Sequence, residues 1–87
     1  MGYSRPRPKY LAAKLLRIRQ ALGLSQVQLA KRLNVGINYN FVSKYERNLN
    51  EPPLMVLLAY ARLVNIPAEI LMDDQLDLPP EIRRHHI

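Results

Sequence analysis

The stretch NYNFVSKYER, which begins at Asn38, is rich in side chains that bind polar partners. One set follows i, i+3, i+4 and i+7 spacing, so a helix would gather it on one face: Asn40, Ser43, Lys44 and Arg47. An Asn side chain can bond to N6 and N7 of adenine, and a Lys to O6 and N7 of guanine or to a phosphate. The alternative interpretation is a solvated surface helix, in which Asn38 and Asn40 only cap and hydrate the chain.

The charges of the chain are distributed unevenly. The first 45 residues contain nine bases and no acid, whereas residues 46–87 contain four bases and all seven acids, for a net charge of +6. A basic half on a small domain favours a polyanionic partner, and nucleic acid is the first candidate. An anionic membrane surface is a lesser alternative, and a plainly solvated surface is the third.

Several classes of function are disfavoured by what the sequence lacks. There is no cysteine, and the only two histidines are the adjacent His85 and His86, so we expect no metal site and no cofactor. No acid–base arrangement is suggested, so we expect no enzymatic activity. No apolar run approaches the roughly 20 residues of a membrane span, and no signal peptide is recognisable. We expect a cytoplasmic, nucleoid-associated protein without a membrane partner.

Helical spacing predicts the elements that must position the polar face. Leucine and isoleucine recur from Leu11 to Leu22 and predict a helix over residues 9–22, which Gly23 ends. The stretch LMVLLAYARLV from Leu54 predicts a central helix, because it is apolar almost all round. AEILMDD, which begins at Ala68, predicts a short last helix.

Two short helices lie between the first helix and the central one. Ser25 with Gln28 forms a capping box, so a helix should follow that ends near Leu33. Asn38 is a good N-cap for the next helix, which should begin at Tyr39. In total we expect five helices and no strand.

The two ends of the chain differ from its middle. Residues 1–8 alternate Arg with Pro and predict an extended basic arm. Residues 74–87 contain two adjacent prolines and predict a loosely held C-terminal tail. The expected organisation is therefore an arm at 1–8, a helical domain at 9–73 and a tail at 74–87.

Two short helices joined by a glycine-bearing turn follow the plan of a helix-turn-helix. In this plan the sequence resembles the family of Cro and the phage repressors, often called the XRE family. The resemblance covers about residues 9–72 and rests on LRIRQALGLSQVQLAKRLNV, VSKYERNLNEPP and LLAYARLVNIPAEIL. It implies an all-α, compact five-helix lambda-repressor-like domain, with the helix-turn-helix formed by the second and third helices.

The resemblance also implies a function and a set of contacts. It implies sequence-specific binding of double-stranded DNA by a small transcriptional regulator, expected to be a repressor, with the third helix (about residues 39–47) in the major groove. The expected DNA-binding residues are Ser25, Gln26, Asn38, Tyr39, Asn40, Ser43, Lys44, Arg47 and Asn50. In the arm, Arg5 or Arg7 is expected in a minor groove. Four further bases are expected to be solvated rather than in contact: Lys14, Arg17, Lys31 and Arg32.

Arg19 is expected to form a structural ion pair with Glu46. Arg19 lies at the edge of the buried stripe of the first helix, and a buried guanidinium needs a carboxylate partner. Glu46 is the only acid among the first 50 residues. Members of the similar family often pair an Arg and a Glu at these places.

The sequence departs from the family pattern in two places. Similar proteins have two fewer residues between the leucine that ends the second helix, here Leu33, and the aliphatic residue inside the third, here Val42. The surplus is expected in the turn around Gly36 and Ile37, which affects how the third helix approaches DNA. The family often has Gly where this chain has Asn48, and Asn also tolerates a positive φ.

The chain has more apolar residues than one small core needs, and this points to partners other than DNA. We expect a homodimer on DNA, in which such residues pack across a two-fold axis: Met55, Val56, Leu63, Leu76, Leu78 and Ile82. The alternative is that they cover the core of the single chain. The alternative function is a protein-interaction adaptor, such as the antitoxin partner of a toxin, and RNA binding is less favoured.

Overall fold

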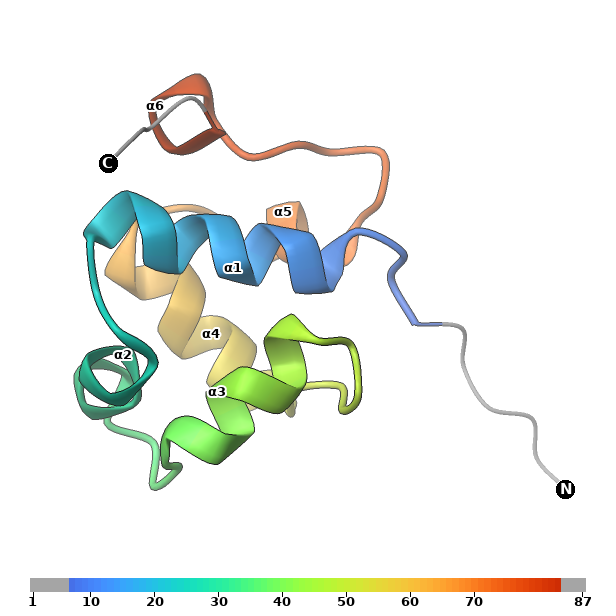
Figure 1. Cartoon of the computed structure of the whole chain (residues 1–87). Coiled ribbons are helices and arrows are strands. Elements are labelled where there is room, and N and C mark those ends of the chain that lie inside the picture. The colour runs from blue at the N-terminus through green and yellow to red at the C-terminus, as the bar shows by residue number, and fades with distance from the viewer. Residues whose placement is uncertain (1–6, 84–87) are drawn as a thin grey trace, which may run out of the picture.

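Six helices make up residues 7–83, the part of the chain that the computed structural model describes, and no strand occurs among them. In chain order they are α1 (Leu11–Leu22), α2 (Gln26–Leu33), α3 (Tyr39–Glu46), α4 (Leu54–Leu63), α5 (Glu69–Met72) and α6 (Pro80–Arg83) (Figure 1). The predicted all-α class is confirmed. The sequence predicts five of these helices and misses α6, a single turn near the C-terminal end.

Single residues set the boundary between α1 and α2. Gly23 follows α1 with a φ of 69°, and its N–H donates to the Gln20 carbonyl at 3.1 Å. A left-handed residue at this place ends the helix and turns the chain. At the start of α2, the Ser25 hydroxyl accepts from the Gln28 N–H at 3.0 Å, and the Gln28 side chain accepts from the Ser25 N–H at 2.8 Å. The predicted capping box is therefore confirmed.

The turn between α2 and α3 contains two residues with left-handed backbone conformation. Asn34 has a φ of 53° and Gly36 a φ of 77°, and Gly tolerates this region without a steric penalty. Val35, which lies between them, and Ile37, which follows Gly36, are partly buried and pack against the core, and this anchors the turn. Asn38 caps α3, which begins at Tyr39 as the sequence predicts.

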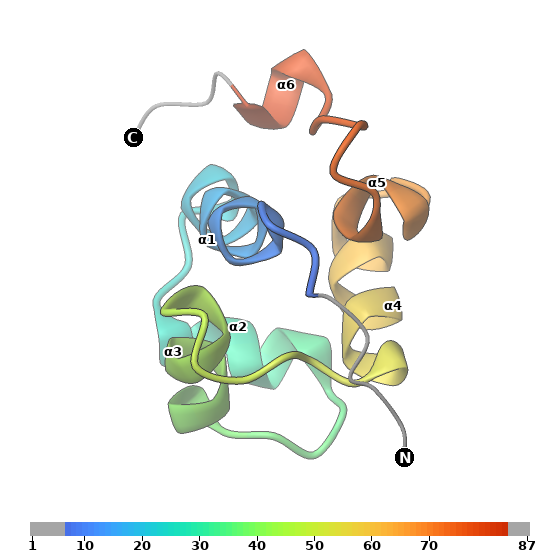
Figure 2. The same ribbon diagram turned by 90° about the vertical axis from the view of Figure 1, so that its right-hand side faces the viewer.

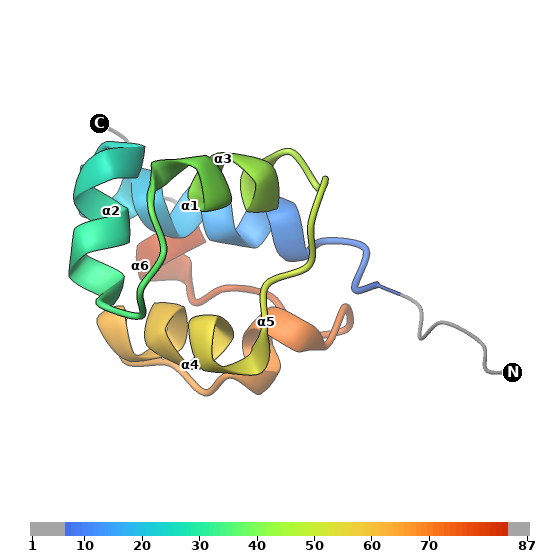
Figure 3. The same ribbon diagram turned by 90° about the horizontal axis from the view of Figure 1, so that it is seen from below.

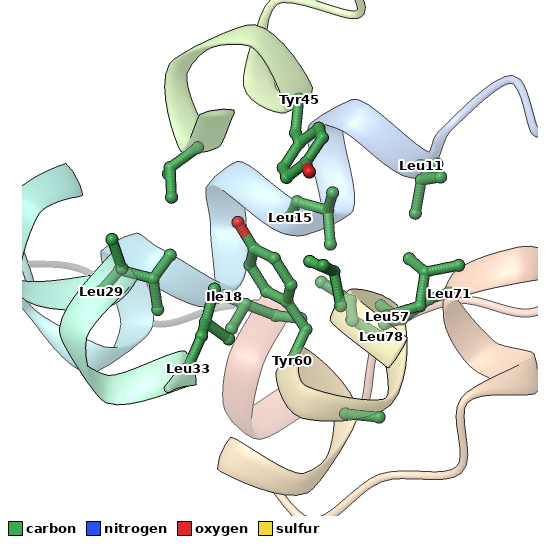
Figure 4. Packing of buried hydrophobic residues seen from close by; sticks show 14 of the residues in the cluster. Leu11, Leu15, Ile18, Leu29, Leu33, Tyr45, Leu57, Tyr60, Leu71 and Leu78 are labelled. Carbon is green, nitrogen blue, oxygen red and sulfur yellow. The ribbon is translucent and has the colours of Figure 1, made fainter. Parts of the chain in front are cut away.

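The core lies between α1, the α2–α3 pair and α4. Its fully buried side chains come from every long helix and from α5: Leu15, Ile18, Leu29, Val42, Tyr60 and Leu71. Leu15, Ile18 and Leu29 lie around Tyr60 (Figure 4). The α1 helix contacts α3, α5 and α6, and α2 contacts α3 and α4. Seen along its axis, α1 has α6 on one side and the α2–α3 pair on the other (Figure 2). The fold therefore fixes α3 from behind, through α1 and α2.

The C-terminal segment is packed more firmly than the sequence predicts. Leu78 and Ile82 are only 4% and 8% exposed, and α6 lies against α1. The expectation of a loosely held tail is wrong for residues 74–83, because these two apolar side chains complete the core of the same chain. Val56 is likewise buried within the chain, whereas Met55 and Leu76 remain exposed. A partner copy would therefore meet fewer of the apolar residues than expected.

Candidate nucleic-acid interface

The third helix buries one side and exposes the other. Val42 is fully buried and Tyr45 is 3% exposed, so they attach α3 to the core. On the outer side Tyr39 is 49% exposed, and Asn40 and Lys44 are exposed as well. Neither the Asn40 amide nor the Lys44 ammonium bonds to another residue within 7–83. Donors and acceptors suited to base edges therefore face solvent on a helix whose other side is fixed.

Four further predicted contact residues belong to the same surface, and three of them make local bonds. The Asn38 side-chain oxygen accepts from the Asn40 N–H at 2.9 Å, which fixes the start of α3 and leaves the Asn38 amide nitrogen outward. Arg47 donates through Nε to the Ser43 hydroxyl at 3.1 Å. An Arg side chain has five N–H donors, so most of this guanidinium stays available. Asn50 is exposed in the loop that follows α3.

The N-terminus of α2 lies beside this surface, as the view from below shows (Figure 3). The N–H groups of Gln26 and Val27 in its first turn meet no acceptor among residues 7–83. Free N–H groups and the positive end of the helix dipole suit a phosphate. The Gln26 side chain, however, turns inward, since its amide nitrogen donates to Glu46 Oε1 at 3.0 Å. Gln26 was predicted from the sequence as a DNA-binding residue, and its bond to Glu46 was not anticipated.

Arg19 and Glu46 form the ion pair that the sequence predicts. Arg19 Nε donates to Glu46 Oε2 at 2.7 Å and Nη2 donates to Oε1 at 3.1 Å, while Nη1 donates to the Leu24 carbonyl at 3.0 Å. The side chain of Glu46 is only 5% exposed and that of Arg19 20%. The pair joins α1 to the end of α3. It also neutralises the single acid of the first 50 residues, so the outer surface stays basic.

Tyr60 lies behind this pair in the core. Its hydroxyl points toward α3 in Figure 4, and it is the one buried side-chain polar atom among residues 7–83 without a hydrogen-bond partner. Burial, and secondarily the Glu46 carboxylate, raises the pKa of Tyr60 well above its usual range. The side chain therefore stays neutral and serves the packing of the core.

Arg7, near the end of the predicted arm, lies beside the C-terminal end of α3. Arg7 Nη1 donates to the Asn48 carbonyl at 2.8 Å and to its side-chain oxygen at 3.4 Å. Asn48 has a φ of 60°, so it occupies the left-handed position where similar proteins often have Gly. Arg5 lies outside the described residues.

Lys14 is a structural residue that sequence reasoning assigned wrongly to solvent. It is 5% exposed, and its Nζ donates to the carbonyl oxygens of Ile70, Asp73 and Leu76 at 2.6, 3.1 and 2.8 Å. Its place three residues after Leu11 lies on the buried stripe of α1, which is the signal that could have revealed it. Lys31 and Arg32 are exposed, in line with solvated charges, whereas Arg17 is partly buried.

Other kinds of site find no support in the described part of the chain. Residues 7–83 contain no group of three or more His, Asp or Glu side chains arranged to hold a metal ion. His85 and His86 lie outside those residues. No helix within the same range has the length and apolar character to cross a membrane.

Comparison with known proteins agrees with the arrangement of α2 and α3. The model of a protein family described as helix-turn-helix matches residues 15–71, about two thirds of the chain. The matched region begins within α1 and ends in α5, so it includes both helices, the turn and the core that supports them. No curated protein and no solved structure is significantly similar to the chain.

Proposed function

Because the chain belongs to the XRE-type helix-turn-helix family of DNA-binding regulators, we propose that it is a transcriptional repressor that reads the DNA major groove with α3. The observation that supports this most is the exposed polar side of α3, which carries donors without a partner among residues 7–83 while its other side is fixed in the core. A protein that occupies a promoter blocks transcription and needs only such a DNA-binding face to do so. Repression is therefore the favoured mode of action. We place the protein in the cytoplasm, at the nucleoid.

Base recognition is assigned to the first two turns of α3. Asn40 would pair with adenine through its amide, and Lys44 would donate to guanine O6 and N7. Tyr39 and Ser43 lie on the same approach and would contact a base edge, a thymine methyl or the backbone. Asn38 primarily caps the helix, and its outward amide nitrogen would meet the backbone.

Phosphate contacts are assigned around the rim of this surface. At the start of α2 we assign them to Ser25 and to the free N–H groups of Gln26 and Val27, since the Gln26 side chain is held by Glu46. Beyond α3 we assign them to Arg47 and Asn50. Arg7 is expected to contribute a further charge.

The protein would bind as a homodimer, because a single α3 spans only a few base pairs. Leu54 and Met55, at the start of α4, are 59% and 63% exposed, and such neighbouring apolar side chains suit a contact between two copies. The same exposed pair is what favours the second candidate function, an adaptor that binds another protein. In that case a partner would bind equally well to variants of α3.

Selection of preferred sites from a pool of random duplexes, combined with a salt series, tests the proposal. We expect enrichment of two half-sites about one helical turn apart, and a steep fall of affinity with salt. Asn40→Ala should relax preference at one base pair and weaken binding by about 1–3 kcal/mol. Lys44→Ala should weaken binding too, whereas Arg62→Ala, which removes the same charge from the end of α4, should not. No enriched half-site with a flat salt response would refute the proposal.

A further inference from the structure

Asp74, in the loop between α5 and α6, holds the residues that lead into α1. The Asp74 carboxylate accepts from the backbone N–H of Lys9 at 2.8 Å and from that of Tyr10 at 3.1 Å. These two residues join the arm to the start of α1. A residue 64 positions further along the chain therefore fixes where the arm leaves the domain.

The loop that carries Asp74 is itself fixed from inside. Lys14 Nζ donates to the carbonyls of Asp73 and Leu76, one residue before and two residues after Asp74. The Asp73 side chain accepts from the Gln75 N–H at 2.9 Å, which closes a tight turn. Because Lys14 is buried on α1, the loop and the arm are both tied to the same helix. The carboxylate is thus presented at a defined position.

The fixed position of Lys9 and Tyr10 places Arg7 close to the end of α3. Two residues before Lys9, its guanidinium reaches Asn48, next to the end of α3. Asn48 is neutral, so the charge of Arg7 is not compensated by this contact, and its other N–H groups can still bond to a phosphate. Arg7 and Pro8 line a cavity of about 350 Å³ together with Leu57 of α4, so the bonds from Asp74 to Lys9 and Tyr10 add to the Arg7–Asn48 contact in fixing residues 7–10.

We propose that Asp74 is a positioning residue for DNA binding: it holds residues 7–10 so that Arg7 stands beside the end of α3, ready to contact the phosphate backbone that flanks the recognised bases. The inference rests on the proposed function. An arm held in place before binding loses less conformational freedom when it meets DNA, and this strengthens binding without any additional contact.

The charge of Asp74 itself acts in the opposite direction, because a carboxylate repels DNA. Asp77 supplies a matched control for this effect. It is an exposed acid three residues further along, and it pairs with Arg83 and the Leu78 N–H rather than with the arm. Asp74→Ala and Asp77→Ala remove the same charge from the same segment, and only the first should release Arg7.

The test is a double-substitution cycle with the full-length protein and the DNA site selected for it. We expect Asp74→Ala to bind about three- to tenfold more weakly than Asp77→Ala, as loss of a preordered side chain implies. In an Arg7→Ala background the two variants should bind equally, because the positioned group is gone. Equal binding of the two variants with Arg7 present, or an equally large deficit of Asp74→Ala without Arg7, would overturn the inference.

Amide exchange in the free protein tests the role of Asp74 independently of DNA binding. In nuclear magnetic resonance spectra, the Lys9 and Tyr10 amides should be protected from exchange in the parent protein and in Asp77→Ala, but not in Asp74→Ala. Loss of protection in both variants, or in neither, would overturn the positioning role of Asp74. If the parent protein shows these protected amides but binds no DNA at any salt concentration, the proposed function fails while the placement of the arm by Asp74 stands.

Discussion

The ion pair between Arg19 and Glu46 yields the sharpest prediction about stability. The Glu46 carboxylate accepts three hydrogen bonds, two from Arg19 at 2.7 and 3.1 Å and one from Gln26 at 3.0 Å. Glu46→Ala removes all three and leaves a guanidinium that is 20% exposed, with the Leu24 carbonyl as its remaining acceptor. An uncompensated buried charge of this kind costs about 3–5 kcal/mol. Since water can still reach part of Arg19, we expect a value near the lower end.

Such a loss is large for a domain of this size. Native domains are stable by only about 5–15 kcal/mol. Each kcal/mol lowers the Tm of a domain of 60–100 residues by about 4–8 °C, so Glu46→Ala should lower the Tm by at least about 12 °C. Urea and thermal unfolding followed by circular dichroism measure both quantities.

The exposed pair Asp77–Arg83 provides the control. Its side chains are 61% and 43% exposed, so Asp77→Ala should change stability little. Replacement of both buried partners, as in Arg19→Met with Glu46→Met, should recover most of the stability that Glu46→Ala loses, because no charge remains buried. If Glu46→Ala proves as mild as Asp77→Ala, or if the double replacement recovers nothing, the argument from burial is refuted.

Three further predictions concern single groups. Tyr60→Phe should leave the free energy of unfolding unchanged or raise it, since a buried hydroxyl without a partner costs about 1–3 kcal/mol; a clear decrease in urea unfolding would show that the hydroxyl is bonded. Lys14→Met should lower that free energy by about 1.5–3 kcal/mol and make residues 74–83 sensitive to protease, because three carbonyls lose a charged donor; unchanged resistance would contradict this. The N–H groups of Lys9 and Tyr10 hold the pKa of Asp74 below its usual range. The ionised Asp74 carboxylate therefore stabilises the folded state fully above an unfolded pKa of about 3.9, and this stabilisation is lost as the pH falls through the lower folded pKa. The Lys9 and Tyr10 amide shifts should therefore be constant between about pH 5 and 7 and change only in acid, and a transition near neutrality would refute the assignment.

Local patterns in the sequence were sufficient for most of the helical framework. The capping box at Ser25 and the cap at Asn38 depend on residues at most three positions apart, so they can be recognised without any tertiary information. The left-handed conformations of Gly23 and Gly36 follow from glycine itself. The same local patterns, together with the family resemblance, placed the polar face of α3 on a helix with the correct first residue.

The pairing of Arg19 with Glu46 could also be anticipated, from the acid count together with the family resemblance. A guanidinium at the edge of a buried stripe needs an acid, Glu46 is the only acid among the first 50 residues, and the similar family often pairs an Arg and a Glu at these places. The partner of Gln26 could not be found in this way, because a side-chain amide at a helix start can bond to many different acceptors. Only the packing of α2 against α3 turned it toward Glu46.

What the tertiary structure alone decided is how residues 7–10 and 74–83 meet the rest of the domain. By itself the sequence determined a helix-turn-helix with a basic outer face, since helical spacing, caps and charge are properties of neighbouring residues. It could not show that Lys14 is buried, that Leu78 and Ile82 finish the core, or that Asp74 holds the arm. Each of these contacts joins residues more than 50 positions apart, and their strength comes from burial and hydrogen-bond geometry, which exist only once the helices have packed.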